Sequence, residues 1–128
     1  QVLKQIVGGN IVLVGHLLPH VISKDNLRLV IVLRCSPEEL KLRYSARSYS
    51  DSKINENIMS EILDICFAEA LNAFGTDSLY EFDTTGKKPI EIAQEIEKIF
   101  YGYRKKSVER INWMSKIVDE DDIQKYLG

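Results

Sequence analysis

One stretch decides the fold of this chain, residues 29–65: LVIVLRCSPEELKLRYSARSYSDSKINENIMSEILDI. Its opening apolar run, Leu29–Leu33, is short and rich in β-branched residues, which predicts a strand buried on both faces. A helix start follows, with Ser36 at the N-cap and Pro37 at the first helical position. Glu39, three residues after the cap, can reach back to the cap amide. A strand that runs into a capped helix indicates an α/β protein.

Basic side chains gather where this first helix meets a second one. Arg43 and Arg47 stand near the end of the first helix, Ser50 breaks the chain, and Lys53 follows in the next helix. Such a junction can close over an anion. Taken alone, the two arginines also fit a solvated helix face.

The rest of the chain alternates apolar runs with turn residues. An unbroken β-branched run suits a central strand, and apolar residues at helical spacing predict amphipathic helices. The further predicted elements are a helix end at Gln1–Gly9, a strand at Ile11–Val14, a loop with a helical turn at 19–26, a helix at 51–74 with Ile54, Ile58, Ile62 and Ile65 as its apolar stripe, a strand at Leu79–Phe82, and a helix from Pro89 that Gly102 ends.

Composition sets broad limits on function. With 128 residues, 45% hydrophobic and 28% charged, the chain has room for one modest domain. A net charge of −2 argues against binding nucleic acid through bulk charge. The longest apolar run, Ile11–Leu18, is interrupted and too short to cross a bilayer, so we expect no membrane partner. Cys35 and Cys66 form no disulfide framework, and we expect buried, reduced thiols in a cytoplasmic protein.

Two histidines could suggest a metal site, but the pattern is poor. His16 and His20 are four residues apart, as on one face of a helix, yet Pro19 lies between them and no third ligand is near. The sequence therefore predicts no metal ligand in this chain.

Several motifs in fixed order carry a resemblance to a known family. They are Leu33-Arg34-Cys35-Ser36-Pro37-Glu38-Glu39-Leu40, then Arg43, Arg47-x-Tyr49-Ser50, Lys53-Ile54, Glu56-Asn57 and Glu61–Asp64, with Val12–Leu17 upstream and Tyr80–Lys87 downstream. Their order and spacing resemble the archaeal and eukaryotic small adenylate kinases, which also act as ATPases in small ribosomal subunit maturation. The resemblance covers residues 11–101.

The resemblance implies a fold, a reaction and a set of site residues. The fold is the P-loop NTPase (adenylate-kinase-like) three-layer α/β parallel sheet, N-terminally incomplete, with residues 1–103 as its C-terminal part, a lid at about 43–57 and a charged extension at 104–128. The reaction is phosphoryl transfer between ATP, with Mg, and AMP, or ATP hydrolysis, and a small-subunit ribosomal protein is an implied partner. By resemblance, Arg43, Arg47 and His16 are catalytic, Tyr49 and Lys53 shape the lid, and Thr84, Thr85, Gly86 and Lys87 border the adenine.

Three departures from the family pattern limit that implication. The loop Gly-x-x-x-x-Gly-Lys-Ser/Thr, whose amides hold the phosphates, is absent from these residues. Val14 stands where the family has an acidic residue two positions before the histidine, and Ser48 stands where it has glycine. Serine at position 48 is tolerable unless the backbone needs a positive φ. We therefore expect this chain by itself to bind ATP weakly and to be inactive.

The missing loop also removes a strand. In P-loop kinases that strand lies between the strands corresponding to Ile11–Val14 and Leu29–Leu33, so we expect open edges, reduced stability and self-association. Two other readings remain open. One is a catalytically degenerate module that docks a ribosomal protein. The other is an unrelated α/β domain, favoured if Arg43 and Arg47 point away from Asp83–Lys87.

The C-terminal residues carry opposed charge runs. Arg104-Lys105-Lys106 and Arg110 precede Trp113, and Asp119–Asp122 follows it. Such runs are typical of a solvated extension. The alternative is a docking tail with Trp113 as its apolar anchor.

Overall fold

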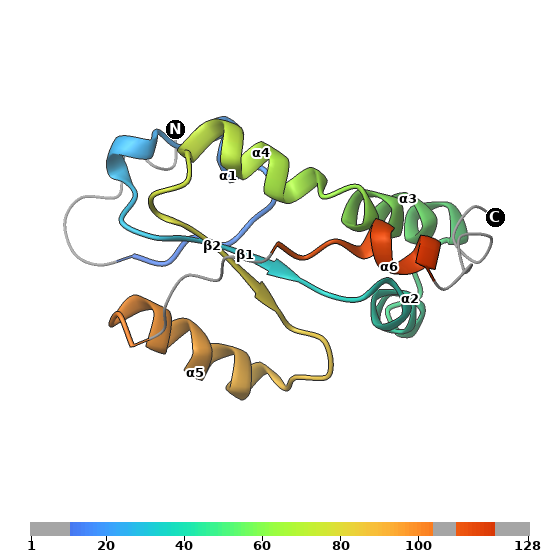
Figure 1. Ribbon diagram of the computed structural model, residues 1–128. Coiled ribbons are helices and arrows are strands. Elements are labelled where there is room, and N and C mark those ends of the chain that lie inside the picture. The colour runs from blue at the N-terminus through green and yellow to red at the C-terminus, as the bar shows by residue number, and fades with distance from the viewer. Residues whose placement is uncertain (1–10, 104–109, 120–128) are drawn as a thin grey trace.

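Two parallel strands form the centre of the computed structural model, which describes residues 11–103 and 110–119. Strand β1 (Val30–Arg34) pairs with β2 (Leu79–Asp83) in register from Val30 opposite Leu79 to Arg34 opposite Asp83. Helix α4 (Ile65–Phe74) covers one face of this sheet and α5 (Pro89–Phe100) lies on the other (Figure 1). The chain is thus a three-layer α/β protein with a parallel sheet, as predicted.

The predicted helix start after β1 is confirmed, with one correction. In α2 (Pro37–Ala46), the Ser36 hydroxyl accepts from the Glu39 amide at 3.3 Å and Pro37 is the first helical residue. The Glu39 side chain, however, does not return to the cap amide. That amide donates instead to Thr85 Oγ1 at 2.8 Å. The start of α2 is therefore held against the residues that follow β2.

The predicted helix at 51–74 is two helices, α3 (Asp51–Ile62) and α4. Asp64 separates them with a left-handed backbone, φ 57°, while its carboxylate accepts from Arg34 Nη2 at 2.6 Å. The break changes which residues face inward. Ile65, predicted to extend the stripe of α3, is 40% exposed, and α4 buries Phe67 instead.

Two apolar clusters stabilise these layers. One lies between the sheet and α4, and its buried members are Val32, Phe67, Ala70, Phe74 and Leu79. The other covers the stripe of α3 with residues from the C-terminal helix α6 (Trp113–Asp119), and its buried members are Ile54, Ile58, Ile62, Trp113 and Ile117. Helices α2, α3 and α6 gather beyond the carboxyl ends of the strands (Figure 1).

The prediction of a strand at Ile11–Val14 is wrong. These residues have no regular secondary structure, and Val12 and Val14 are 87% and 91% exposed. An extended segment becomes a strand only when a neighbour satisfies its backbone groups, and within the described residues β1 pairs only with β2. The following loop contains two short turns of helix, α1 (Leu18–Val21) and η2 (Lys24–Asn26), in agreement with the sequence.

The C-terminal part departs from the expected solvated extension. Helix α5 ends as predicted, at Gly102 with φ 76°, but Trp113 and Ile117 are buried at 7% and 6% exposure. The predicted helix end at Gln1–Gly9 and the charge runs at 104–106 and 120–122 lie outside the described residues. Within the described part, every helix is too short or too polar to cross a membrane.

Candidate functional site

A tight turn after β2 is joined to the end of β1. The backbone amide and the hydroxyl of Thr84 both donate to the Arg34 carbonyl at 2.7 Å, so the Thr84 side chain is buried at 4% exposure. The amide of Lys87 closes the turn by donating to the Thr84 carbonyl at 3.0 Å. Gly86 has φ 72° within this turn, a conformation that favours glycine.

The Glu39 carboxylate connects this turn to α2. Its two oxygens accept from the Gly86 amide at 3.0 and 3.1 Å, and Oε2 also accepts from Arg43 Nη2 at 2.7 Å. Arg43 Nη2 in addition donates to the Thr84 carbonyl at 3.3 Å. We call this set, Glu39, Arg43, Thr84 and Gly86, the Glu39 bridge. It places Arg43 at the Asp83–Lys87 turn, where the adenylate-kinase resemblance expected both Arg43 and Arg47.

Cys35 is hydrogen-bonded to the carboxylate of the Glu39 bridge. Its thiol is 5% exposed and donates to Glu39 Oε2 at 3.2 Å. Burial, followed by the hydrogen bond to Glu39, raises the pKa of Cys35 to about 11, so the thiol keeps its proton near neutral pH. The Cys35 thiol and the Gly86 amide in turn lower the pKa of Glu39. The expected burial is confirmed for Cys35 and wrong for Cys66, which is exposed.

The other predicted lid residues stand apart from the bridge. Arg47 is exposed at the end of α2 and has no carboxylate partner among the described residues. The Tyr49 ring lies 5.5 Å from the Tyr44 ring. Lys53 Nζ lies 4.0 Å from a Glu56 carboxylate oxygen in an exposed pair. Ser48 has φ 59°, so the backbone there does need the conformation that favours glycine.

The remaining predicted residues divide between the turn and a distant loop. Thr85 Oγ1 donates to Asp83 at 2.5 Å, and Lys87 Nζ lies 5.8 Å from the centre of the Phe82 ring. His16 is exposed in the turn before α1, and no hydrogen bond or ion pair joins it to the bridge within the described residues. That part of the chain also holds no group of three or more His, Cys, Asp or Glu residues suited to a metal ion.

A second cluster of charged residues, centred on Arg34 at the end of β1, was not predicted from the sequence. Arg34, 1% exposed, places its guanidinium nitrogens 2.6 Å from carboxylate oxygens of Glu61, Asp64 and Glu81. Burial by itself lowers the pKa of Arg34, but hydrogen bonds and charges from Glu61 and Asp64 outweigh it and raise the pKa above its usual value. The buried cation is thus fully compensated, and it fixes the carbonyl that holds Thr84.

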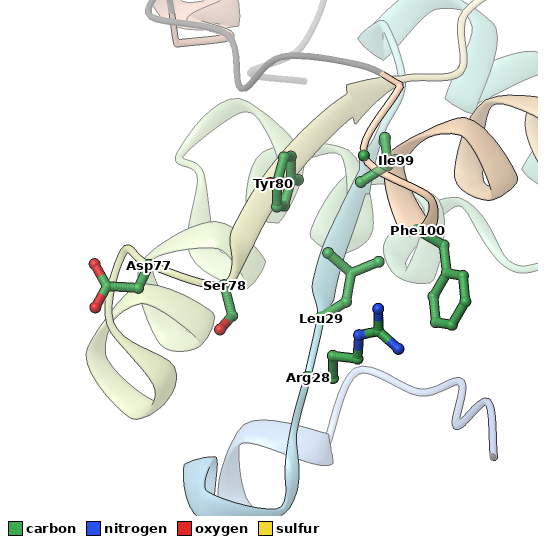
Figure 2. A pocket seen from close by; sticks show the side chains of 8 residues that line it. Arg28, Leu29, Asp77, Ser78, Tyr80, Ile99 and Phe100 are labelled. Carbon is green, nitrogen blue, oxygen red and sulfur yellow. The ribbon is translucent and has the colours of Figure 1, made fainter.

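A hollow of about 240 Å³ lies at the other end of the strands. Figure 2 shows its lining, in which Arg28 and Leu29 precede β1 and Ser78 precedes β2. The Arg28 guanidinium carbon stands 4.7 Å from the centre of the Phe100 ring. Open α/β sheets bind ligands beyond the carboxyl ends of their strands. We therefore place the candidate site at the Glu39 bridge and not in this hollow.

The bridge shows what this site can do chemically. An amide and a guanidinium group converge on a carboxylate, which is a donor set suited to an anion or to a polar acceptor edge. Glu39 already occupies these donors, so Arg43 is largely neutralised. Arg47, one helical turn further on, is exposed and has no carboxylate partner among the described residues. The sequence does show a glutamate three residues after the Ser36 cap, but the capping pattern explains that residue equally well, so its role in the bridge was not predicted.

Comparisons with known proteins show the family of the chain. The family model described as "AAA domain" matches residues 1–64 of the 128. Curated relatives named "Putative adenylate kinase" include those of Pyrococcus furiosus, 39% identical over 117 residues (91% of this chain, 61% of the relative), Thermococcus onnurineus, 37% over 120 residues (94% and 62%), and Methanosarcina barkeri, 42% over 103 residues (77% and 53%). The chain spans about three fifths of the length of the first two relatives. It belongs to the AAA-domain family of P-loop NTPases and, within them, to the adenylate kinase family.

Proposed function

We propose that this chain supplies the lid and the adenine side of a nucleoside monophosphate kinase that transfers a phosphoryl group between ATP and AMP. The lid is residues 43–57, within the domain that residues 1–103 form by resemblance and whose core also includes Trp113 and Ile117. The observation that carries the proposal is the Glu39 bridge, which joins the lid helix α2 to the Thr84–Lys87 turn beyond the carboxyl ends of both strands.

In this proposal the two lid arginines have different roles. Arg43 is tied to Glu39 at 2.7 Å and anchors the lid to the turn. Arg47 is exposed and unpaired within the described residues, so it is the group that can stabilise charge on the transferred phosphoryl. Gly86 and Lys87 border the base. His16 lies outside this arrangement, and we assign it no step.

Magnesium would neutralise phosphate charge during the transfer. The residues described here do not fit such an ion: they hold no group of three or more His, Cys, Asp or Glu side chains suited to a metal, and the three carboxylates around Arg34 are paired with its guanidinium group. We therefore route no step through a metal. A phosphate-binding amide loop is also missing from these 128 residues, and an exposed arginine contributes only weakly against water and salt. We expect weak ATP binding and no turnover from the chain alone.

Titration with a fluorescent ATP analogue tests the proposal. The chain is titrated alone and then mixed with the part of the P. furiosus relative that lies outside the match. We expect the mixture to bind at least tenfold more tightly than either part (about 1.4 kcal/mol or more), because the family resemblance assigns the phosphate-binding amide loop to the part that this chain does not match. Arg47→Ala should lower that affinity, and Lys41→Ala, an exposed cation of the same helix, should not. Equal effects of the two variants, or no binding by the mixture, would refute the proposal.

The resemblance also implies a small-subunit ribosomal protein as a partner and a cytoplasmic location, and both stay predictions. Exposed Leu42, directly before the lid, and Tyr49 within it, at 71% and 45%, leave apolar surface for such a contact. A pull-down with purified small-subunit proteins, comparing Leu42→Asp with the unmodified chain, would measure it.

A further inference from the structure

The segment Arg110–Ile117 packs against helix α3. Helix α3 starts at Asp51, directly after the junction that carries Arg47 and Tyr49. The buried stripe of α3 is covered by Trp113 and Ile117, with Ile111 and Met114 beside them. This segment therefore buries the apolar face of α3, the helix whose first residues form the end of the lid.

Trp113 is also hydrogen-bonded into the charged cluster. Its Nε1 donates to Glu61 Oε1 at 2.9 Å, and the same oxygen accepts from Arg34 Nε at 2.6 Å and from the Cys35 amide at 3.2 Å. Glu61 belongs to the last turn of α3, whereas Arg34 ends β1. Glu61 Oε1 thus links α3, the end of β1 and the segment Arg110–Ile117 by hydrogen bonds.

Arg110 provides a second attachment, on the sheet. Its Nε lies 2.6 Å from Glu81 Oε1, Nη2 lies 3.7 Å from Asp64 Oδ2, and its guanidinium carbon lies 3.4 Å from the centre of the Phe67 ring. Glu81 is on β2 and Asp64 lies between α3 and α4. The segment is therefore fixed at both ends of its path, on the sheet by Arg110 and on α3 by Trp113.

The same cluster reaches the lid from its other side. Tyr44, which lies between the two lid arginines on α2, packs against the residues around Trp113 and against the Tyr49 ring. Burial raises the pKa of Tyr44, in keeping with its place at the edge of this core. Helices α2 and α3 therefore both pack against the same apolar cluster, and the lid junction connects the two helices.

We infer that Trp113 is a positioning residue for the nucleotide site: through α3 it sets where the lid junction, with Arg47 and Tyr49, stands relative to the Thr84–Lys87 turn. The inference rests on the proposed function for its consequence on nucleotide binding. Its structural half, that the C-terminal segment holds the lid, stands on the contacts alone.

Hydrogen–deuterium exchange tests the structural half without any nucleotide. In Trp113→Ala, amides of residues 43–57 should exchange about tenfold faster, while those of β1 and β2 should keep their rates. Ile117→Ala removes a smaller side chain from the same apolar cluster and should speed exchange at residues 43–57 less strongly. If Trp113→Ala does not fold, the exchange rates of Ile117→Ala test the inference in its place. Ser115→Ala, on the exposed side of α6, is the matched control and should behave as the unmodified chain.

Binding of the ATP analogue by the mixture described above tests the consequence. We expect Trp113→Ala and Ile117→Ala to weaken it about tenfold, and Ser115→Ala to leave it unchanged. The inference is overturned if lid exchange stays at the unmodified rate while residues 110–119 open. It is also overturned if lid exchange rises and the binding midpoint does not move. If the unmodified mixture binds no analogue, the proposed function fails, whereas lid exchange still reports whether the segment holds the lid.

Discussion

Removing the charge of Glu39 is the most direct perturbation of the candidate site. In Glu39→Gln the side chain keeps its shape and one acceptor oxygen for the Gly86 amide, but the ion pair with Arg43 is lost. The bond to the Gly86 amide has a charged acceptor, and we assign its weakening about 0.5–1 kcal/mol. The Glu39–Arg43 pair is partly exposed, at 27% and 35% for the two side chains, so we assign it about 0.5 kcal/mol. The unfolding free energy at pH 7 should fall by about 1–1.5 kcal/mol.

The stabilisation by Glu39 should depend on pH in a direction that follows from its lowered pKa. The Cys35 thiol and the Gly86 amide lower the pKa of Glu39 below its ordinary 4.5, so the folded chain favours the ionised carboxylate. The stabilisation is therefore fully present above pH 4.5 and is lost as the pH falls through the lower, folded value. The difference between the unmodified chain and Glu39→Gln should shrink toward zero on acidification, because the unmodified chain then also carries a neutral side chain.

Urea unfolding followed by the fluorescence of Trp113, the one tryptophan of the sequence, measures this difference. Glu38→Gln is the control. It removes an exposed charge from the same first turn of α2 and should cost only about 0.3 kcal/mol through the helix dipole. A Glu39→Gln difference that matches the Glu38→Gln difference, or that stays constant from neutral to acid pH, would refute the role of the bridge.

Three further predictions concern the lid, the thiols and the open sheet. Ser48→Gly should raise the unfolding free energy by about 0.5 kcal/mol, because relief at positive φ exceeds the entropy cost of glycine. Ser45→Gly, inside α2, should lower it by about 0.5 kcal/mol in the same urea experiment. At pH 8 a thiol reagent should modify Cys66 and leave Cys35, whose pKa is about 11, and mass spectrometry of the peptides reads this directly. The chain should self-associate in sedimentation experiments through the strand edge that is unpaired within the described residues, and a strict monomer with a sharp two-state melt would contradict that.

The elements that local signals define were predicted well. The strand before Ser36, the proline-led start of α2 and the glycine end of α5 each depend on residues adjacent in sequence, and the structure has all three. The position of Arg43 beside the Thr84–Lys87 turn was also predicted, although only the family resemblance supplied it.

The errors share a different cause, because each depends on a partner far away in the sequence. The break at Asp64 has no glycine or proline to announce it, and its left-handed backbone serves a bond to Arg34, 30 residues earlier. The apolar run at Ile11–Val14 has strand propensity but no strand beside it among the described residues. Propensity alone cannot supply backbone hydrogen bonds, so the segment has no regular secondary structure and is exposed.

Glu39 shows how one residue type can satisfy two patterns that sequence reasoning cannot separate. Three residues after a serine cap, a glutamate is expected to accept from the cap amide, and here Thr85 takes that amide instead. The carboxylate is thereby released to hold the Gly86 amide and Arg43. The exchange needs the turn after β2 to arrive beside the start of α2, which the parallel pairing of β1 and β2 provides. A phosphate loop is a contiguous motif that can be recognised in a sequence directly, whereas the Glu39 bridge is assembled across the sheet and becomes visible only once the strands are paired.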